Sequence, residues 1–393
     1  AALGIARRAF ALSGPAGQNR AWQLGTDYWR VILPQGTAAA PNGLGGVTTF
    51  DIDGNGAANV AYAGDLTGRL WRVQLPGATG TWNPAPEVIF RAVASDGSAQ
   101  PITAPPGATI GPLYQGAFLV FGTGKLLEPV DSKPVGGVFG VNSMYGIWDK
   151  TPTTSSTAQI KRNDLMGQRI IVTETNGAYS NGSADNAALE FSLTSAYVPN
   201  YTSEARSNAI YGTEDPLATA PTASTPPNQR GWYFDMPFSD RTGERSIYRP
   251  ELVGSFSIFV NAMPSAEACE GGGAEAQYAL ETLTGGRSAF GGFDRDANGK
   301  IQGSNGSILG DQSAFGLGAS SGQRASYFAS RRESSGGFGQ MSIMKTAVSA
   351  GTSSSAGSGC DGAGLAPIGA QSYSSGLIGT QRLPGGCIGR VQW

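Results

Sequence analysis

Residues 50–75 read FDIDGNGAANVAYAGDLTGRLWRVQL, and this stretch decides the fold. Acidic and amide residues occupy alternate positions at its start, and two strand-like runs follow directly, NVAYAG (59–64) and GRLWRVQL (68–75). Between these runs the sequence is typical of a hairpin turn, in which Asp65 accepts hydrogen bonds from turn amides and Gly68 takes a positive φ. The stretch therefore predicts a polar loop followed by an antiparallel hairpin.

Similar strand-like runs recur along the whole chain. They are rich in β-branched and aromatic residues and are bounded by Gly, Pro, Asn and Asp, which is the pattern of short strands joined by turns. The runs are TDYWRVIL (26–33), EVIFRAV (87–93), GAFLVFGTG (116–124), RIIVTET (169–175), GWYFDM (231–236) and SFSIFVNAM (255–263). Tryptophan recurs in DYWRV, RLWRV, YGIWD and RGWYFD, so we predict an all-β fold of the propeller type in preference to a large sandwich. One weak helical pattern lies at 265–271, and the final GRVQW is again strand-like.

The composition agrees with many turns and few helices. The chain has 393 residues, of which 59 are glycine, and charged residues make up 14%, well below the usual ~25%. We predict a single domain over 1–393 that carries two long, irregular insertions. The first, 151–230, is rich in Thr, Ser, Ala, Asn and Pro, and the second, 303–380, is dominated by Ser and Gly. Long loops of this kind are best explained by contact with a partner.

Several classes of function are excluded or disfavoured. The net charge of -2 supplies no field that attracts a phosphate backbone, so nucleic acid is not an expected partner. Histidine is absent, which excludes a Ser-His-Asp triad, a Cys-His pair and the common imidazole metal sites. No run reaches the ~20 apolar residues of a membrane span, and the opening AALGIARRAF is too short and too arginine-rich for a secretory signal. We expect a mature protein or a piece of a longer one.

The three cysteines do not settle the redox compartment. Cys269, Cys360 and Cys387 form no CxxC pair and are too scattered for a zinc knuckle. One disulfide with one free thiol is compatible with export, and proximity suggests Cys360 with Cys387. The pairing stays open.

The polar loop at the start of the opening stretch has the spacing of a calcium site. Calcium takes six to eight oxygen ligands, which loops supply from alternate positions, with glycine at the sixth and a backbone carbonyl at the seventh. Gly56 is sixth when Asp51 is counted as first, and the glutamate of EF-hand loops at position twelve is absent. The predicted calcium ligands are Asp51, Asp53, Asn55, Ala57 through its carbonyl, and Asn59. The alternative is an Asx-rich turn without an ion.

A second, poorer copy of this loop is DRDANGKIQ at 294–302. The predicted ligands of a second calcium ion are Asp294, Asp296, Asn298, Lys300 (the seventh position) and Gln302. Arg295 and Lys300 add positive charge, so a plain turn is an equal alternative here.

Catalytic patterns are otherwise sparse. Glu128 and Asp131 read as surface turn residues, and GTGK at 122–125 lacks the upstream glycine and the following Ser or Thr of a phosphate-binding loop. We therefore expect a protein that is not an enzyme.

The ordered motifs resemble those of the PilY/PilC family, the type IV pilus tip-associated adhesins and assembly factors. In that family a short calcium loop precedes a hairpin of the form YAGD…G.LWR, as it does at 50–75. The other motifs occur in matching order: FLVFGTGKLLEP (118–129), SMYGIWD (143–149), RNDLMGQ (162–168), GWYFDMPFSDRTGER (231–245), FVNAMPSAEACEGGGAEAQYALETLTGGR (259–287) and GRVQW. Together they span about 47 to 393. This chain differs from the family pattern in having Asn at the fifth and ninth loop positions, where Asp is more usual.

The resemblance implies a modified β-propeller, which we take to be seven-bladed, at the C-terminal end of a larger exported protein. It also implies a Ca²⁺ cofactor at Asp51–Asn59 and a place at the pilus tip or cell surface, in association with the outer membrane. The implied function is support of pilus assembly and extension, surface adhesion and twitching motility. The implied partners are minor pilins and a host or abiotic surface.

Two other classes of protein compete with this interpretation. Propellers that bind pyrroloquinoline quinone are dehydrogenases with a calcium ion and Trp-containing repeats, but their motif recurs in every blade and is joined by a cysteine pair. Integrin-like propellers use calcium loops for protein binding and also repeat the loop in several blades. This chain has one firm copy and one poor copy.

Overall fold

The computed structural model describes fifteen segments of the chain. They are residues 2–6, 28–34, 36–38, 41–75, 85–132, 139–152, 159–176, 189–204, 227–236, 243–264, 273–287, 330–336, 341–348, 364–372 and 378–382.

Strands dominate the described residues. In chain order they are β1 (Ala2–Ala6), β2 (Tyr28–Ile32), β3 (Leu44–Phe50), β4 (Val60–Asp65), β5 (Arg69–Gln74), β6 (Pro86–Arg91), β7 (Gly107–Ile110), β8 (Ala117–Gly122), β9 (Ser143–Asp149), β10 (Met166–Gln168), β11 (Ile170–Asn176), β12 (Leu189–Thr194), β13 (Gly231–Asp235), β14 (Glu251–Val253), β15 (Phe256–Met263), β16 (Gly273–Glu281), β17 (Ser330–Gly336), β18 (Met341–Val348), β19 (Gly364–Ser372) and β20 (Ile378–Arg382). The helices of the described segments are three short 3₁₀ turns: η1 (Pro112–Tyr114), η2 (Pro129–Ser132) and η3 (Arg162–Asp164).

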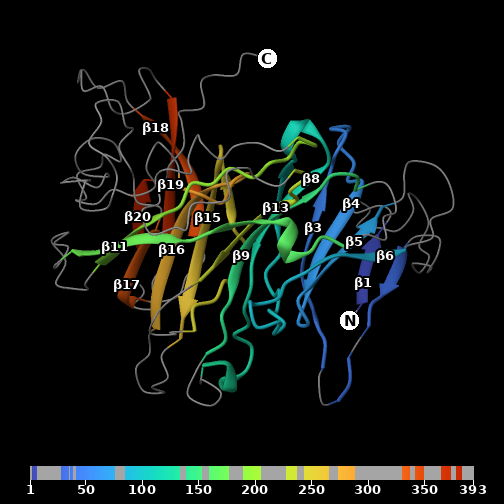
Figure 1. Cartoon of the computed structure of the whole chain (residues 1–393), viewed down its shortest axis with the longest axis horizontal. Coiled ribbons are helices and arrows are strands. Elements are labelled where there is room, and N and C mark those ends of the chain that lie inside the picture. The colour runs from blue at the N-terminus through green and yellow to red at the C-terminus, as the bar shows by residue number, and fades with distance from the viewer. Residues whose placement is uncertain are drawn as a thin grey trace, which may run out of the picture.

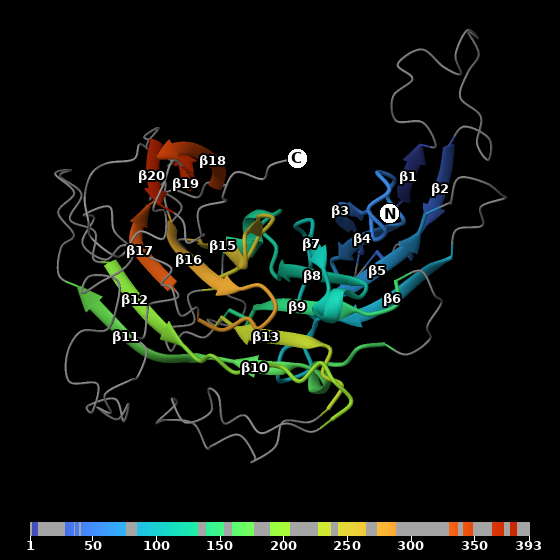
Figure 2. The same cartoon turned by 90° about the horizontal axis from the view of Figure 1, so that it is seen from above.

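The strands form five sheets, and the chain passes from the third sheet to the fourth and back, since β11 and β12 lie between β10 and β13 in sequence. Their strand orders are β1-β2, β3-β4-β5-β6, β10-β13-β9-β8-β7, β11-β12-β17-β16-β15-β14 and β18-β19-β20. Neighbouring strands are antiparallel except for β10 with β13. Seen from above, the sheets are arranged side by side along an arc, from the blue N-terminal strands to the red C-terminal ones (Figures 1 and 2).

The predicted strands are confirmed. Each of the eight runs quoted above contains a strand, from β2 to β15. The patterns at 265–271 and at the C-terminus lie outside the described residues, as do all three cysteines. Parts of the predicted insertions are also strands: β10, β11 and β12 lie within 151–230, and β17, β18 and β19 lie within 303–380.

The sheet built on β8 and β9 is buried on both faces. On β8, Phe118 and Val120 belong to one core cluster, whereas Leu119 and Phe121 belong to another. The strand β9 alternates in the same way. Its Met144 and Trp148 pack with residues of β15 and β16, and its Tyr145 and Ile147 pack with residues of β4 to β6. Alternate side chains of one strand point to opposite faces, so each hydrophobic core lies between two successive sheets.

Close packing, of a side chain in one case and of backbone in the other, explains two glycines at the centre of this sheet. A Cβ atom on Gly146 would lie 2.2 Å from Nε1 of Trp232. Gly231 has φ +136, and a Cβ atom there would lie 1.8 Å from the carbonyl oxygen of Gly146. The pairing of β9 with β13 therefore requires glycine at both positions.

Buried polar groups connect one sheet to the next. Arg72 on β5 donates from Nη1 to Asp149 Oδ1 of β9 over 2.9 Å, and the Tyr62 hydroxyl donates to Asp149 Oδ2 over 2.8 Å. Since β4 and β5 belong to one sheet and β9 to the next, these bonds fix the packing of the two sheets.

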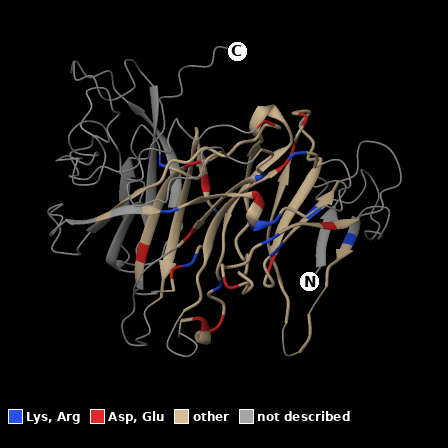
Figure 3. Cartoon of the chain, viewed as in Figure 1, with Lys and Arg blue, Asp and Glu red and all other residues tan. Residues whose placement is uncertain are grey.

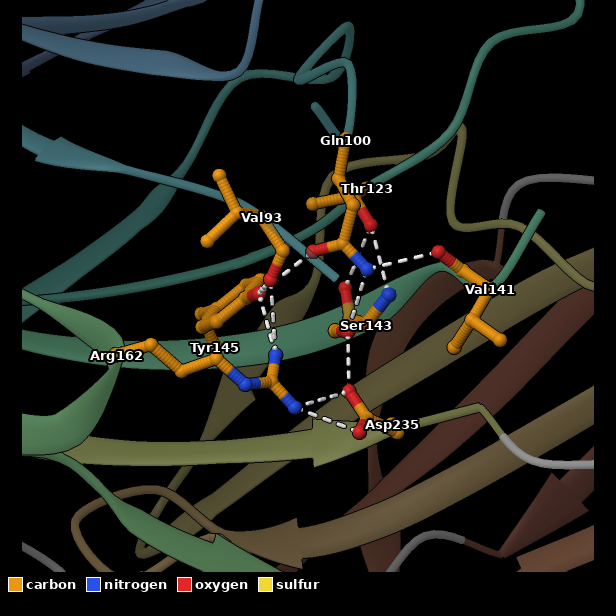
Figure 4. A network of polar contacts seen from close by, with 8 residues as sticks. All are labelled: Val93, Gln100, Thr123, Val141, Ser143, Tyr145, Arg162 and Asp235. Atoms are coloured by element: carbon orange, nitrogen blue, oxygen red, sulfur yellow. Dashed lines mark hydrogen bonds and ion pairs between the residues drawn. The ribbon is translucent and has the colours of Figure 1, made fainter. Parts of the chain in front are cut away.

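A second polar network lies beside β9 and is drawn in Figure 4. Arg162 donates to both carboxylate oxygens of Asp235, at 2.8 and 2.6 Å, and the Ser143 hydroxyl donates to Asp235 Oδ1 at 2.6 Å. Gln100 accepts from the Tyr145 hydroxyl at 2.6 Å and donates to Ser143 Oγ at 2.8 Å. The network joins η3, β9, β13 and the segment that follows β6.

Acidic and basic residues are scattered over the described ribbon and are not gathered by sign (Figure 3). In the described part of the chain, no helix has the length and apolar character needed to cross a membrane.

Candidate metal centre

The predicted calcium loop connects β3 to β4. The two strands pair with Phe50 opposite Val60, so residues 51–59 form the whole connection of this hairpin. The Asn59 amide donates to the Phe50 carbonyl over 2.9 Å, and the Leu75 amide donates to the Asn59 carbonyl over 2.8 Å. The loop is therefore attached at its base to three consecutive strands of one sheet.

Asp51 organises the first half of the loop. Its Oδ1 accepts from the Gly54 amide at 2.8 Å, and its Oδ2 accepts from the Gly56 amide at 2.7 Å. Gly54 and Gly56 have φ of +71 and +87, a conformation that glycine adopts without strain. Gly56 thus provides the sharp turn that the sixth position of a calcium loop requires.

Asp53 lies at the centre of the second half. Its Oδ2 is 3.0 Å from Nδ2 of Asn55 and 3.4 Å from Nδ2 of Asn59. The Asn55 Oδ1 accepts from the Ala57 amide at 2.8 Å, and the Asn59 Oδ1 accepts from the Ile52 amide at 2.7 Å. The side-chain amides of Asn55 and Asn59 therefore both donate to one carboxylate oxygen of Asp53, which brings positions three, five and nine of the loop together.

The first carboxylate is held in its charged form. Desolvation acts to raise the pKa of Asp51, but hydrogen bonds from the backbone amides of Gly56, Gly54 and Asn55 outweigh it, and the pKa is lowered. A carboxylate that stays ionised in an exposed loop is a suitable ligand for a hard cation.

The residues of the loop fit a calcium ion in donor chemistry. They offer two carboxylates, two side-chain amides and the exposed backbone of Ala57, all within one hairpin connection. The described residues contain no cluster of three or more Asp, Glu, His or Cys side chains with metal-binding geometry. Any ion here would depend on amide and carbonyl oxygens as well as on Asp51 and Asp53.

The second predicted loop, with Asp294, Asp296, Asn298, Lys300 and Gln302, lies outside the described residues.

The structural interpretation of Asp65 is confirmed. Its Oδ1 accepts from the amides of Thr67 and Arg69 at 2.9 and 3.0 Å, and its Oδ2 accepts from the Trp71 indole at 2.9 Å. Gly68 has φ +79, as the turn predicts. Asp65 is thus a buried organiser of the β4–β5 hairpin.

A cavity beside Trp148 was not predicted from the sequence. Its lining residues come from β9, from the segment around η3, from the segment after β12 and from the segment before β13. No single stretch contains the site, so no local motif marks it.

Small, mostly antiparallel sheets arranged along an arc, with hydrophobic cores between them, define a protein of the β-propeller class. Comparison with known proteins supports this class. Residues 26–181 match the family model described as the PilY1 beta-propeller domain. The crystal structure of the C-terminal domain of Pseudomonas aeruginosa PilY1 superposes with a TM-score of 0.61 and 21% identity, covering 91% of this chain and 64% of that one. At this identity the likeness shows the fold alone.

Two curated relatives match the chain in sequence. The type IV pilus biogenesis factor PilY1 of Pseudomonas aeruginosa strain PAO1 is 29% identical over 295 residues, which cover 69% of this chain and 23% of that protein. A PilY1 homolog of Xylella fastidiosa is 28% identical over 258 residues, covering 62% of this chain and 14% of that protein. The chain therefore spans about a quarter or less of the length of these relatives.

These findings confirm the predicted resemblance to the PilY/PilC family. They also confirm the all-β propeller fold, whereas the number of blades stays a prediction.

Proposed function

We propose that this chain is the propeller region of a type IV pilus biogenesis factor that supports pilus assembly and extension, surface adhesion and twitching motility. The curated relatives, which are type IV pilus biogenesis factors, support this proposal. Under this proposal the chain is not an enzyme. It is exported and lies at the pilus tip or at the cell surface, in association with the outer membrane. Its partners are minor pilins and a host or abiotic surface.

We propose further that Ca²⁺ binds at Asp51, Asp53, Asn55, Asn59 and the carbonyl of Ala57. One observation carries this proposal: Asn55 and Asn59 converge on Asp53 within a hairpin connection whose Asp51 carboxylate is held ionised. A bound cation would supply positive charge between Asp51 and Asp53 and would fix the loop to β3 and β4. This would stabilise the first complete sheet of the propeller.

Thermal unfolding with and without calcium tests the site. An ion that binds only the folded state adds RT ln(1 + [Ca]/Kd) to stability, about 2.7 kcal/mol when free calcium is about 100 times Kd. We expect calcium to raise the Tm of the full chain by a few degrees relative to EGTA. The Asp53→Ala variant should lose most of this difference.

The matched control is Asp96→Ala. Asp96 is also an exposed aspartate whose Oδ1 accepts a turn amide, that of Ser98 at 2.9 Å, but it lies outside the loop. Its calcium-dependent shift in Tm should equal that of the unaltered chain. An equal shift in Asp53→Ala, or no shift in the unaltered chain at millimolar calcium, would refute the calcium site.

The pilus function needs a cellular test. Asp53→Ala and Asp96→Ala are introduced into the full-length protein of the source cells, and surface pili and twitching zones are measured. We expect fewer pili and smaller zones for Asp53→Ala alone. Normal piliation in cells whose full-length protein lacks the region altogether would contradict a role in pilus biogenesis.

A further inference from the structure

A cavity of about 390 Å³ opens next to the C-terminal end of β9. Its lining includes Trp148, Lys150, Asp164, Tyr201, Asn228 and Arg230. Trp148 and Tyr201 pack edge to face, with ring centroids 5.3 Å apart, and form an aromatic wall. The volume is in the range of small ligand pockets, so the cavity can accept one or two side chains of a partner.

Two cations of the lining form no close ion pair with a described residue. The Arg230 guanidinium donates from Nε and Nη2 to the Trp148 carbonyl, at 3.1 and 2.9 Å. Lys150 places Nζ 5.2 Å from the centroid of the Trp148 ring. Among the residues that the structure describes, neither cation has a carboxylate oxygen within 4.0 Å. Burial lowers the pKa of Arg230, and the opposing effect of the more distant charges of Asp149 and Asp164 is smaller.

The single carboxylate of the lining is already used. Asp164 Oδ2 accepts from the backbone amide of Lys161 at 2.8 Å, which closes the η3 turn. The cavity therefore has two cations, Lys150 and Arg230, against one engaged anion. A partly desolvated cation without a close ion-pair partner is unfavourable, and a ligand carboxylate would compensate it.

An exposed apolar loop adjoins the cavity. The Trp148 indole donates to the Gln115 carbonyl over 2.7 Å, so the β7–β8 connection packs directly against the aromatic wall. At its tip, Leu113 is 58% exposed and Tyr114 is 91% exposed. Both have left-handed backbone angles, φ 58 and 57, which non-glycine residues rarely adopt. Strained residues that present large apolar side chains to solvent are typical of binding surfaces.

We propose that the cavity and this loop together bind an acidic segment of a protein partner. A carboxylate of the segment lies between Lys150 and Arg230, and apolar side chains next to it pack on Leu113 and Tyr114. A polypeptide is favoured over an acidic sugar because a sugar has no aliphatic side chain to bury against Leu113. This binding surface goes beyond the calcium site and does not depend on it.

A random dodecapeptide phage library provides the probe. It is selected on the immobilised full chain, on Lys150→Glu and on Arg91→Glu. Arg91→Glu is the control, because it makes the same change of charge at an exposed arginine of β6 that lies outside the cavity lining. We expect Asp and Glu to be enriched about twofold or more in the peptides selected on the unaltered chain and on Arg91→Glu, since an unpaired cation selects carboxylates. The enrichment should vanish on Lys150→Glu.

Fluorescence anisotropy with one selected peptide then gives affinities. Binding should weaken about tenfold or more for Lys150→Glu and for the Leu113→Ser variant, and less than about twofold for Arg91→Glu. The same peptide with Gln in place of its acidic residues should also bind about tenfold more weakly. The proposal is overturned if the library shows no acidic enrichment or if Lys150→Glu and Arg91→Glu behave alike. It is also overturned if the acidic sugar trigalacturonate displaces the peptide while the Leu113→Ser variant binds the peptide with unchanged affinity. Because the assay contains no calcium, its failure leaves the calcium test untouched.

Discussion

Asp65 shows how one side chain can set a local structure. It is almost fully buried, and its two oxygens accept hydrogen bonds from the amides of Thr67 and Arg69, the Thr67 hydroxyl, the Trp71 indole and the Asn42 amide. Desolvation acts to raise the pKa of Asp65, but the bonds from Trp71, Asn42 and Thr67 outweigh it, so the pKa is lowered below its usual 3.8. The carboxylate therefore stabilises the folded state only while it is ionised.

The pH dependence of this contribution has a definite sign. Because the pKa is lower in the folded state, the stabilisation is present above pH 3.8 and is lost as the pH falls through the folded-state pKa. We expect Asp65→Asn to lower the unfolding free energy at pH 7 by about 2–3 kcal/mol, since donors such as the Trp71 indole lose a charged acceptor.

Chemical unfolding at pH 7, 5 and 3 measures both effects. Stability of the unaltered chain should fall more steeply between pH 5 and pH 3 than that of Asp65→Asn. Parallel curves for the two proteins would mean that Asp65 does not titrate in this range.

At the scale of single residues, the sequence predicted the turn conformations. The turn at Asp65 and Gly68 and the positive φ of Gly56 depend on residues within a few positions of one another, and local chemistry dictates them. The ligand set Asp51–Asn59 is local too, and the structure places Asp53, Asn55 and Asn59 together. Occupancy by an ion depends on coordination that residue order alone does not fix.

At the scale of the strands, glycines set how closely β9 and β13 approach. Gly231 and Gly254 both have positive φ, but only Gly231 faces a neighbouring backbone, with the Gly146 carbonyl in the place of a Cβ atom. The Gly254 position opens to empty space. Gly254, at φ +59, lies in the left-handed helical region, whereas Gly231, at φ +136, lies outside it, so Gly231 combines crowding with a less favourable backbone conformation.

We expect Gly231→Ala to destabilise the protein by about 3 kcal/mol or more, because it adds a steric clash to an unfavourable backbone conformation. Gly254→Ala should cost about 1–2 kcal/mol, the price of left-handed backbone alone. Differential scanning calorimetry of both variants checks this. Equal decreases in stability for the two variants would show that β9 and β13 can move apart to accept a Cβ atom at Gly231.

Strands with strong β propensity were readable from the sequence, and others were not. SMYGIWD and SFSIFVNAM carry aromatic and branched residues, whereas β17 reads SRRESSG and β19 reads GLAPIGAQS. The strand β17 pairs with β12 and β16, and the strand β19 pairs with β18 and β20. Their conformation follows from the neighbouring strands, which is the usual way in which context overrides propensity.

At the scale of the whole molecule, the second, third and fourth sheets share their hydrophobic cores. Phe118, Met144 and Trp148 of the third sheet pack against Phe259 and Tyr278 of the fourth. The Arg72–Asp149 bond likewise connects the second sheet to the third. Such a chain is stable only when successive sheets are present together.

The fragment 1–181 should therefore not fold cooperatively, although it contains the whole region that matches the family model. It lacks β15 and β16, so one face of β8 and β9 would be exposed. We expect strong binding of the dye ANS and a broad thermal transition, compared with a sharp one for 1–393. A sharp transition without ANS binding in the fragment would show that these sheets are independent.

The arrangement of distant segments is what the sequence could not supply. Lys150, Tyr201 and Arg230 meet at one cavity although about 80 positions separate the first from the last, an arrangement that only the stacked sheets create. The number of sheets was equally hidden, because the repeats share little beyond an occasional tryptophan.

The burial of β9 on both faces limits how this protein can diverge. In a saturation mutagenesis library, survivors at the end of β3 should show tolerant and intolerant positions in alternation, since Val47 and Thr49 are exposed whereas Thr48 between them is buried. Across Ser143–Asp149 every position should resist replacement, because neither side of that strand meets solvent. Lineages can therefore vary the rim of the molecule freely, while its central strand accepts change only together with both of its neighbours.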